Sequence, residues 1–158
     1  EIRELLGYEY SYIPQSGDDL GERMKRSFLR CFGEGARSVV LIGSDIPDLP
    51  VSFVDEAFRA LYKQDTVIGP SVDGGYYLIG FKGDTFNEAV FAGISWGTET
   101  VFQETMNILH TAGALVHVLP VWRDIDKHED ILTLIKNSKD TEFADSKTMM
   151  YIKAIGLA

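Results

Sequence analysis

The sequence predicts an α/β fold in a single domain, and three observations lead to this prediction. The chain has 158 residues, a natural length for one domain with one buried core. Val39 to Ile42 are four consecutive large aliphatic residues without polar alternation. Such a run is typical of a strand covered on both faces, as in parallel sheets. Strand-like and helix-like segments also alternate along the chain, which is the order of elements in α/β proteins.

The first half of the chain contains two predicted strands, each followed by a predicted helix. Residues 8–13 are aromatic and β-branched, which favours a strand, and residues 20–32 follow as an amphipathic helix. The central strand over 39–42 ends at Gly43. The next helix, over 52–63, repeats apolar residues at helical spacing.

The second half continues this alternation up to the C-terminus. In chain order, we predict a strand over 66–70, a turn over 71–75, a strand over 76–81, an irregular region over 82–97, a helix over 98–113, a strand over 114–122, a helix over 127–137 and one more helix within 139–158. No internal repeat or low-complexity linker interrupts the sequence, so the prediction is one domain over 1–158.

Composition excludes several classes of protein. The formal net charge is −9, which argues against a nucleic-acid-binding surface. Cys31 is the single cysteine, so an internal disulfide is impossible and a reducing, cytoplasmic location is expected. No apolar run reaches membrane-spanning length, so no membrane partner is expected. The sequence does not fix the oligomeric state and allows a homo-oligomer.

Acidic side chains follow three of the predicted strands. Asp45, Asp73 and the pair Asp124 and Asp126 each come after a strand, and open α/β sheets bind ligands outside the carboxyl ends of their strands. Mg²⁺ takes oxygen ligands, usually one or two carboxylates together with water and substrate phosphate. Two aspartates from separate strand ends would satisfy this requirement. A cation would also help so acidic a chain to handle phosphates.

Each of these acidic residues also has a purely structural interpretation. Asp45 can form an Asx turn. The residues around Asp45, taken alone, support this interpretation at least as well as they support a metal site. Asp126 stands where a helix N-cap is expected, with Glu129 as a capping-box partner. Asp73 opens an Asp-Gly-Gly sequence that a hairpin turn also requires. We interpret Asp124 as a solvated or turn residue.

Five groups of residues together resemble one protein family. They are Gln15-x-x-x-x-Leu20-Gly21-x-Arg23-Met24, Leu41-Ile42-Gly43-Ser44-Asp45-x-Pro47-x-Leu49, Ile68-Gly69-Pro70-x-x-Asp73-Gly74-Gly75-Tyr76-Tyr77-Leu78-Ile79-Gly80, Trp96-x-Thr98, and Asp124-Ile125-Asp126 with Glu129-Asp130. They look like the glycosyltransferase-A-like proteins of the DUF2064 group, proposed nucleotide-diphospho-sugar transferases related in fold to sugar-nucleotide and molybdenum-cofactor nucleotidyltransferases. The resemblance covers nearly the whole chain. It implies a Rossmann-like, three-layer α/β/α fold with a mixed, mostly parallel sheet.

The resemblance also implies roles for individual residues. Asp45 and Asp126 would bind Mg²⁺ or Mn²⁺, and Asp45 and Asp73 would be catalytic. The nucleotide would contact Gln15, Gly21, Ser44 and Asp45. The substrate would contact Asp73, Gly74, Gly75, Tyr76, Trp96 and Thr98.

The expected function is transfer of a nucleotidyl or glycosyl group from a nucleoside triphosphate or a nucleotide sugar to a small acceptor. The alternative is a nucleotide-binding or sensor module of the same fold without turnover, because a fold alone does not establish catalysis. Relatives begin with a strand and a basic phosphate-binding loop that nothing in this chain matches. We therefore expect an upstream segment containing that strand and loop.

Overall fold

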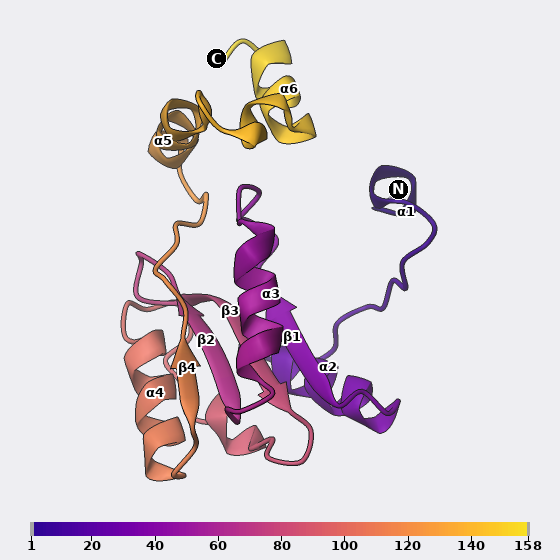
Figure 1. Cartoon of the computed structure of the whole chain (residues 1–158), viewed down its shortest axis with the longest axis vertical. Helices are drawn as coiled ribbons and strands as arrows, with labels where there is room; N and C mark the ends of the chain where they lie inside the picture. Colours follow the sequence, from indigo (N-terminus) through magenta and orange to yellow (C-terminus); the bar gives the residue numbers. More distant parts are fainter. Residues whose placement is uncertain (1, 158) are drawn as a thin grey trace.

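The computed structural model describes residues 2–157 and is built around a four-stranded mixed sheet (Figure 1). Its strands are β1 (Ser38–Ile42), β2 (Thr66–Pro70), β3 (Tyr76–Lys82) and β4 (Val116–Val118), in the order β1-β3-β2-β4. β3 is antiparallel to both of its neighbours, whereas β2 and β4 are parallel. β1, β2 and β4 therefore run in one direction, and their carboxyl ends share one edge of the sheet.

The resemblance implied a mixed, mostly parallel sheet. The mixed sheet is confirmed, but its pairings are not mostly parallel. Two of the three strand pairings are antiparallel, because β3 returns between β1 and β2 as the second arm of a hairpin. β1 is only partly buried, although its aliphatic run predicted a strand covered on both faces. Within the described residues β1 pairs on one side alone, with β3.

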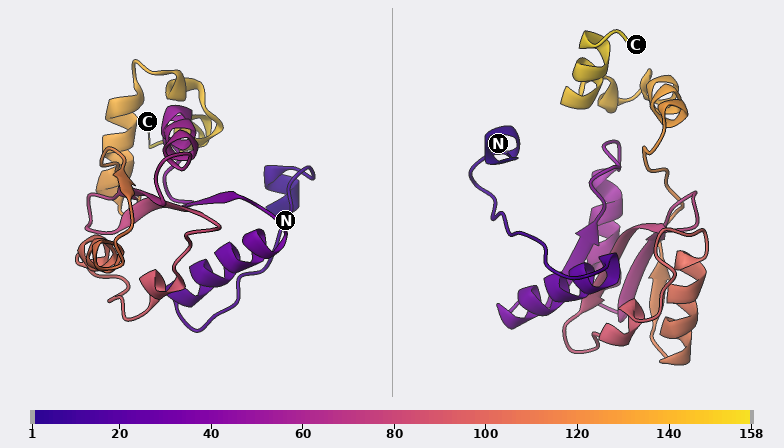
Figure 2. Two further views of the ribbon diagram at one scale, coloured as in Figure 1. Left: turned by 60° about the horizontal axis from the view of Figure 1, so that its bottom comes forward. Right: turned by 180° about the vertical axis from the view of Figure 1, so that it is seen from behind.

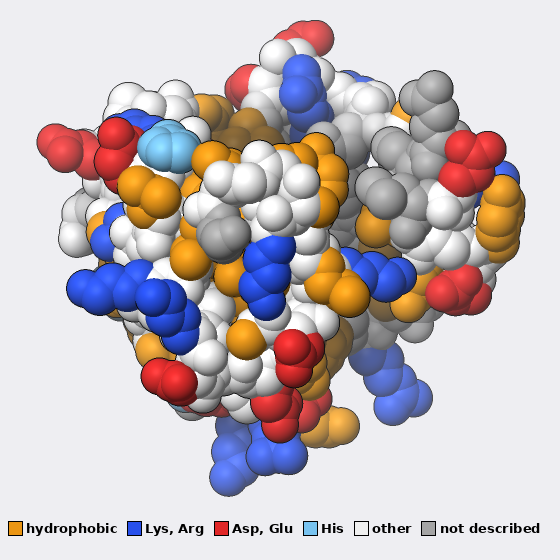
Figure 3. Space-filling view, turned by 90° about the horizontal axis from the view of Figure 1, so that it is seen from above, with side chains coloured by type: hydrophobic (Ala, Val, Ile, Leu, Met, Phe, Trp, Pro, Cys, Tyr) orange, Lys and Arg blue, Asp and Glu red, His pale blue; other side chains and the backbone are white. Residues whose placement is uncertain are grey.

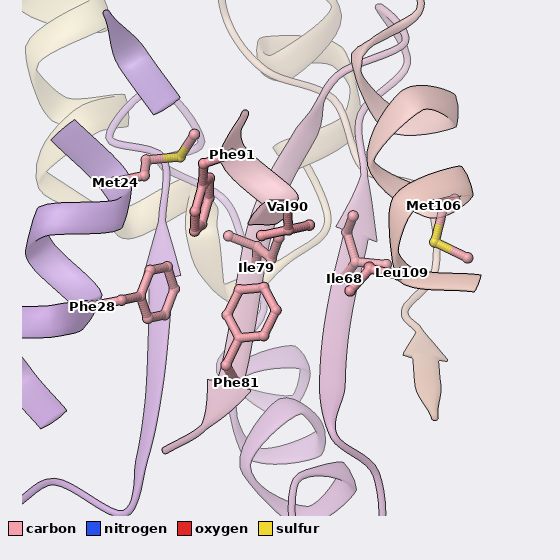
Figure 4. Packing of buried hydrophobic residues seen from close by; sticks show 9 residues of the cluster. All are labelled: Met24, Phe28, Ile68, Ile79, Phe81, Val90, Phe91, Met106 and Leu109. Atoms are coloured by element: carbon pink, nitrogen blue, oxygen red, sulfur yellow. The ribbon is translucent and has the colours of Figure 1, made fainter. Parts of the chain in front are cut away.

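Helices cover both faces of the sheet (Figure 2). α2 (Leu20–Gly33), the short 3-10 helix η1 (Glu88–Phe91) and α4 (Val101–Thr111) pack on one face. Their amphipathic sequences bury one stripe each, and that burial is the main source of stability for helices of this length. The buried residues of this face are Met24, Phe28, Ile68, Ile79, Phe81, Val90, Phe91, Met106 and Leu109 (Figure 4).

The opposite face is covered by α3 (Val51–Ala60). Ala57 is fully buried against Val67 and Leu78 of the sheet, and Leu119 beyond β4 joins the same cluster. The alternation of side chains along a strand divides neighbouring residues between the two cores, so that Val67 faces α3 and Ile68 faces α2 and α4.

A bulge in the β2–β3 hairpin positions the side chain of Tyr77 over Gly69 of β2, with its hydroxyl at the loop after β4. Between Gly69 and Pro70 the register shifts, so that Gly69 pairs with Leu78 and Pro70 with Tyr76. Tyr77 lies between these pairs, and its ring covers Gly69, where a Cβ would come within 2.4 Å of the ring. The Tyr77 hydroxyl donates to the Pro120 carbonyl at 3.0 Å. The bulge thus fixes the loop that leaves β4.

The C-terminal helices form a small cluster beyond the carboxyl edge of the sheet (Figure 1). They are α5 (His128–Ser138), the 3-10 helix η2 (Glu142–Asp145) and α6 (Lys147–Ala154), packed around buried Leu134, Met149 and Ile152. Side chains of both charges and hydrophobic side chains are interspersed on the face seen from this end (Figure 3). No helix in the part of the chain that the structure describes is long and apolar enough to span a membrane.

Most predicted elements are confirmed, but three differ from the structure. Residues 8–13 form no strand and are not part of the four-stranded sheet, and Tyr8 and Tyr10 are exposed. The strand predicted over 114–122 is regular only over β4. The predicted final helix is divided into η2 and α6, and the sequence interpretation missed the short helix α1 (Ile2–Leu6).

Candidate metal and substrate site

Three aspartates come together at the carboxyl edge of the sheet. Asp73 follows β2, while Asp124 and Asp126 follow β4. One carboxylate oxygen from each of the three lies within 4.8 Å of the others. Asp73 and Asp126 are exposed and Asp124 is half-buried. We call these three residues the acidic cluster.

The parallel ladder between β2 and β4 continues past both strands and creates this cluster. Trp122 N donates to the Pro70 carbonyl and Val72 N donates to the Trp122 carbonyl, both at 3.1 Å. A parallel bridge links Ser71 to Trp122. This bridge is offset by one residue from the β2–β4 ladder, in which Ile68 pairs with Val118, and it brings the segments that carry Asp73 and Asp124 side by side.

The loop that carries Asp73 is fixed by its two glycines. Gly75 N donates to Asp73 Oδ1 at 2.9 Å. Gly74 has a φ of +91°, and a Cβ there would lie 2.1 Å from the Glu99 carbonyl oxygen. Phe102 N donates to the Gly74 carbonyl at 2.9 Å, which ties the loop to the start of α4. The loop is therefore a rigid hairpin connection that also presents a carboxylate.

Asp124 lies in an unfavourable environment for a charged carboxylate. Burial raises its pKa above the ordinary range, and the negative charges of Asp73 and Asp126 add to this effect. The Ser71 hydroxyl donates to Asp124 Oδ2 at 3.0 Å and partly offsets the shift in pKa. A cation held between the three carboxylates would remove both the desolvation penalty and the repulsion.

Asp130 supports the cluster from the start of α5. Its Oδ2 accepts hydrogen bonds from Lys127 N at 2.9 Å and Asp126 N at 3.2 Å, and its Oδ1 accepts from Arg123 at 3.2 Å. The backbone hydrogen bond from Lys127 is the largest of the influences that lower the pKa of Asp130. The predicted cap at Asp126 with Glu129 is therefore wrong. Lys127 is the N-cap residue, and Asp130 reaches back from the first turn.

Asp45 lies beside the acidic cluster but is not one of its three members. Its Oδ1 would lie 2.7 Å from a Cβ on Gly43, so the carboxylate folds back over that glycine. The Asp45 carbonyl accepts from Ile125 N at 2.9 Å, which places its backbone next to the segment carrying Asp124 and Asp126. Ser44 is exposed in the same loop. The pairing of Asp45 with Asp126 at a metal stays a prediction.

The other residues predicted to bind the nucleotide or the substrate lie at or near the N-terminus of α2 and around Trp96. Gly21 is buried, and a Cβ there would lie 2.7 Å from both the Trp96 indole and the Phe91 carbonyl. Tyr76 packs edge-on against Trp96 with ring centroids 6.4 Å apart, and burial raises the pKa of its hydroxyl. Thr98 donates to the Ser95 carbonyl at 2.8 Å. Gln15 is exposed in the segment before α2.

The sequence places Asp124 after a strand but favours a solvated or turn residue over a ligand. In the structure Asp124 is half-buried, accepts from the Ser71 hydroxyl and belongs to the acidic cluster. Residues 123–126 form no helix, and in an extended segment side chains two apart point to the same side. The Asp-Ile-Asp spacing could therefore have shown that Asp124 accompanies Asp126.

Known proteins resemble this chain in both sequence and structure. Residues 1–98 match the family described as "Uncharacterized protein conserved in bacteria (DUF2064)". The structure is similar to the crystal structure of a putative nucleotide-diphospho-sugar transferase from Desulfovibrio desulfuricans G20, with a TM-score of 0.92 and 41% sequence identity. The similarity covers 98% of this chain and 68% of that chain. No curated protein matches the chain.

The family match extends over more than half of the sequence, and the structural relative is similar along almost the whole chain. The motifs that suggested the resemblance include the loops that surround the acidic cluster. The chain therefore belongs to the DUF2064 family.

Proposed function

We propose that the chain is a metal-dependent transferase that takes a nucleotide sugar, or a nucleoside triphosphate, as donor and passes a glycosyl or nucleotidyl group to a small acceptor. The acidic cluster at the shared edge of β2 and β4 is the observation that carries this proposal. The 41% identical relative, a putative nucleotide-diphospho-sugar transferase, favours a nucleotide sugar as the donor. The mixed sheet covered by helices on both faces agrees with a Rossmann-like, glycosyltransferase-A type of fold.

The acidic cluster fits a divalent cation such as Mg²⁺ or Mn²⁺. Its ligand atoms are carboxylate oxygens, which hard cations prefer, and the three lie within 4.8 Å of one another. Two oxygens on opposite sides of one Mg²⁺ ion lie about 4.2 Å apart, because each metal–oxygen bond is about 2.1 Å long. The cluster therefore has the dimensions of a single-cation site. A bound cation would supply electrostatic stabilisation of the donor phosphates.

The residues of the acidic cluster would have different roles in the reaction. Asp124 and Asp126 present oxygens from the β4 exit, and Ser71 orients Asp124 through its hydroxyl. Asp73 Oδ1 accepts a hydrogen bond from Gly75 N, and where Asp124 and Asp126 hold the cation, Asp73 Oδ2 can accept the proton of an acceptor hydroxyl. We keep Asp45, Ser44, Gln15 and Gly21 on the donor side, as the family resemblance implies, with Asp45 either reaching the metal or contacting the nucleotide.

Calorimetric titration of the protein with nucleotides and nucleotide sugars, with and without Mn²⁺, tests this proposal. We expect at least one nucleotide sugar to bind only when Mn²⁺ is present, and mass spectrometry to detect its conversion. Asp124→Asn should weaken that binding at least about tenfold, roughly 1.4 kcal/mol. If donor binds without any turnover, the chain is a nucleotide-binding module. If Mn²⁺ changes neither donor binding nor stability, the proposed metal site is wrong.

A further inference from the structure

A cavity of about 200 Å³ lies directly behind the acidic cluster, between the exits of β2 and β4 and the helix α5. Val72, Trp122 and Ile125 line it from the strand exits, and Thr133 and Asn137 line it from α5. Cavities that enclose drug-sized ligands measure roughly 300–1,000 Å³. This one therefore suits a molecule of a single ring or a short chain.

The cavity and the acidic cluster share the same two backbone segments. Val72 precedes Asp73, and Ile125 stands between Asp124 and Asp126. Val72 and Ile125 line the cavity, whereas the carboxylates of the neighbouring aspartates form the acidic cluster. A ligand in the cavity would therefore lie close to the proposed metal, separated from it by the backbone that these residues share.

The backbone segments around Val72 and Ile125 separate the cavity from the acidic cluster, and we call them the wall. Hydrogen bonds hold both segments in place. Val72 N donates to the Trp122 carbonyl, and Ile125 N donates to the Asp45 carbonyl at 2.9 Å. Ordered hydrogen bonds on both sides keep Trp122 and Ile125 in place before a ligand arrives. Such preorganisation lowers the entropic cost of binding.

Two charged side chains line the cavity, Asp48 and Arg123. Arg123 pairs with Asp130 at 3.2 Å, whereas Asp48 Oδ1 accepts a hydrogen bond from the neutral Trp122 Nε1 at 3.2 Å, which supplies no opposite charge. An anionic ligand would meet this carboxylate and the three carboxylates of the acidic cluster. The exposed amide of Asn137 and the faces of Trp122, Val72 and Ile125 remain as contacts. These groups suit an uncharged ligand with hydroxyl groups on one side and C–H groups on the other.

We infer that this cavity binds the acceptor of the proposed transfer reaction, and that the acceptor is a small uncharged polyol or monosaccharide. The inference rests on the proposed function, because it uses the position of the metal and the donor. The Asn137 amide hydrogen-bonds the hydroxyl groups, and the apolar face of the acceptor lies on Trp122. Its reacting hydroxyl extends past the wall toward Asp73.

Two-dimensional NMR of the indole N–H signals tests the inference, because the chain has two tryptophans, Trp122 in the cavity and Trp96 outside it. The protein would be titrated with glycerol, myo-inositol, glucose and mannose, and with glucuronate, glucose 6-phosphate and glucosamine as charged analogues. We expect at least one neutral compound to shift Trp122 but not Trp96, with a Kd in the millimolar range. Its charged analogue should bind at least about tenfold more weakly, roughly 1.4 kcal/mol.

Asn137→Phe fills the mouth of the cavity and should remove the shift of Trp122. Lys136→Phe, at a neighbouring exposed position of α5 that does not line the cavity, is the matched control and should leave the shift unchanged. The inference is overturned if no neutral compound shifts Trp122 up to roughly 50 mM, well above a millimolar Kd. It is also overturned if the two variants behave alike or if charged analogues bind best.

The same samples separate this inference from the proposed function. A Mn²⁺ ion in the acidic cluster would broaden signals near Asp73 and Asp124, and a nucleotide sugar would add its own shifts. Sugar binding without any donor or Mn²⁺ effect would refute the transferase while leaving a sugar-binding cavity. Donor and Mn²⁺ effects without sugar binding would refute the acceptor cavity and leave the transferase.

Discussion

Two carboxylates that follow β4 lie in opposite environments: Asp124 is in the segment that joins β4 to α5, and Asp130 is in the first turn of α5. Asp124 is half-buried beside two other aspartates, and its pKa is raised. Asp130 accepts two backbone N–H groups and pairs with Arg123, and its pKa is lowered. The comparison separates two uses of a carboxylate: Asp130 stabilises the chain as it stands, whereas Asp124 carries a cost that a bound cation would remove.

The largest expected effect comes from Gly74→Ala, which should disturb the loop that carries Asp73 and so affect one of the three carboxylates of the acidic cluster. Gly74→Ala places a Cβ at a φ of +91° and 2.1 Å from the Glu99 carbonyl oxygen. We expect a loss of about 3 kcal/mol, which combines backbone strain with a clash against backbone. The melting temperature should fall by roughly 10 °C, measured by circular dichroism. An unchanged melting temperature would show that the loop is less rigid than its contacts indicate.

Asp124→Asn should have the next largest effect, and it should be confined to cation binding. The amide keeps the hydrogen bond from Ser71 while removing one charge from the cluster. We expect Mn²⁺ affinity to fall at least about tenfold, roughly 1.4 kcal/mol, in isothermal titration calorimetry. Without metal the melting temperature should hold or rise, because repulsion from Asp73 and Asp126 disappears. A lower melting temperature together with normal Mn²⁺ affinity would show that Asp124 stabilises the fold and does not bind the cation.

Asp130→Asn should have the opposite pattern to Asp124→Asn. It should lower the stability of the fold and have little effect on Mn²⁺ binding. The charged hydrogen bonds to Lys127 N and Arg123 are weakened, while the three cluster carboxylates remain. Chemical denaturation should show a lower midpoint, and Mn²⁺ affinity should stay within about twofold, less than 0.5 kcal/mol. Glu129→Gln, a change of charge at the exposed neighbouring position, is the matched control and should alter neither quantity.

The smallest expected effect is that the contributions of Asp124 and Asp130 to the stability of the fold change with pH in opposite directions. A free Asp titrates near pH 3.9. Asp130 has a lowered native pKa, so its stabilisation is present above pH 3.9 and is lost as the pH falls through the native pKa. Asp124 has a raised native pKa, so its cost is absent below pH 3.9 and develops as the pH rises through the native pKa. NMR of the carboxyl carbons should place the two titrations on opposite sides of pH 3.9. Two titrations on the same side would remove the basis of the comparison.

The sequence predicted the elements that have a strong local pattern. α2 and α3 have apolar residues at helical spacing, and β2 and β3 are apolar runs on either side of an Asp-Gly-Gly turn. The shared edge with its aspartates was also predictable, because strands that alternate with helices tend to run in one direction. Residues 8–13 failed because strand propensity has little weight where no neighbouring strand supplies a partner.

Membership of the cluster depended on contacts that no local pattern reports. β3 inserts between β1 and β2, so β2 and β4 are neighbours in the sheet whereas β1 is adjacent to neither. Asp73 accordingly meets Asp124 and Asp126, while Asp45 contacts the same segment through its backbone carbonyl, which accepts from Ile125 N. The ladder that continues to Trp122 and the return of Asp130 to Lys127 are likewise tertiary features.

The hydrogen bonds of the β4 exit have a consequence for the order of folding. Leu119 N donates to Ile68, Trp122 N to Pro70 and Ile125 N to Asp45, so this exit closes three loops that span much of the chain. Contacts at such sequence separation form late, because closing long loops costs entropy before any contact is gained. A nascent chain can assemble the acidic cluster only after residue 126 has left the ribosome. Interactions that are absent from the folding transition state slow unfolding instead of accelerating folding. A divalent cation should accordingly prolong the lifetime of the finished molecule while leaving its folding rate nearly unchanged.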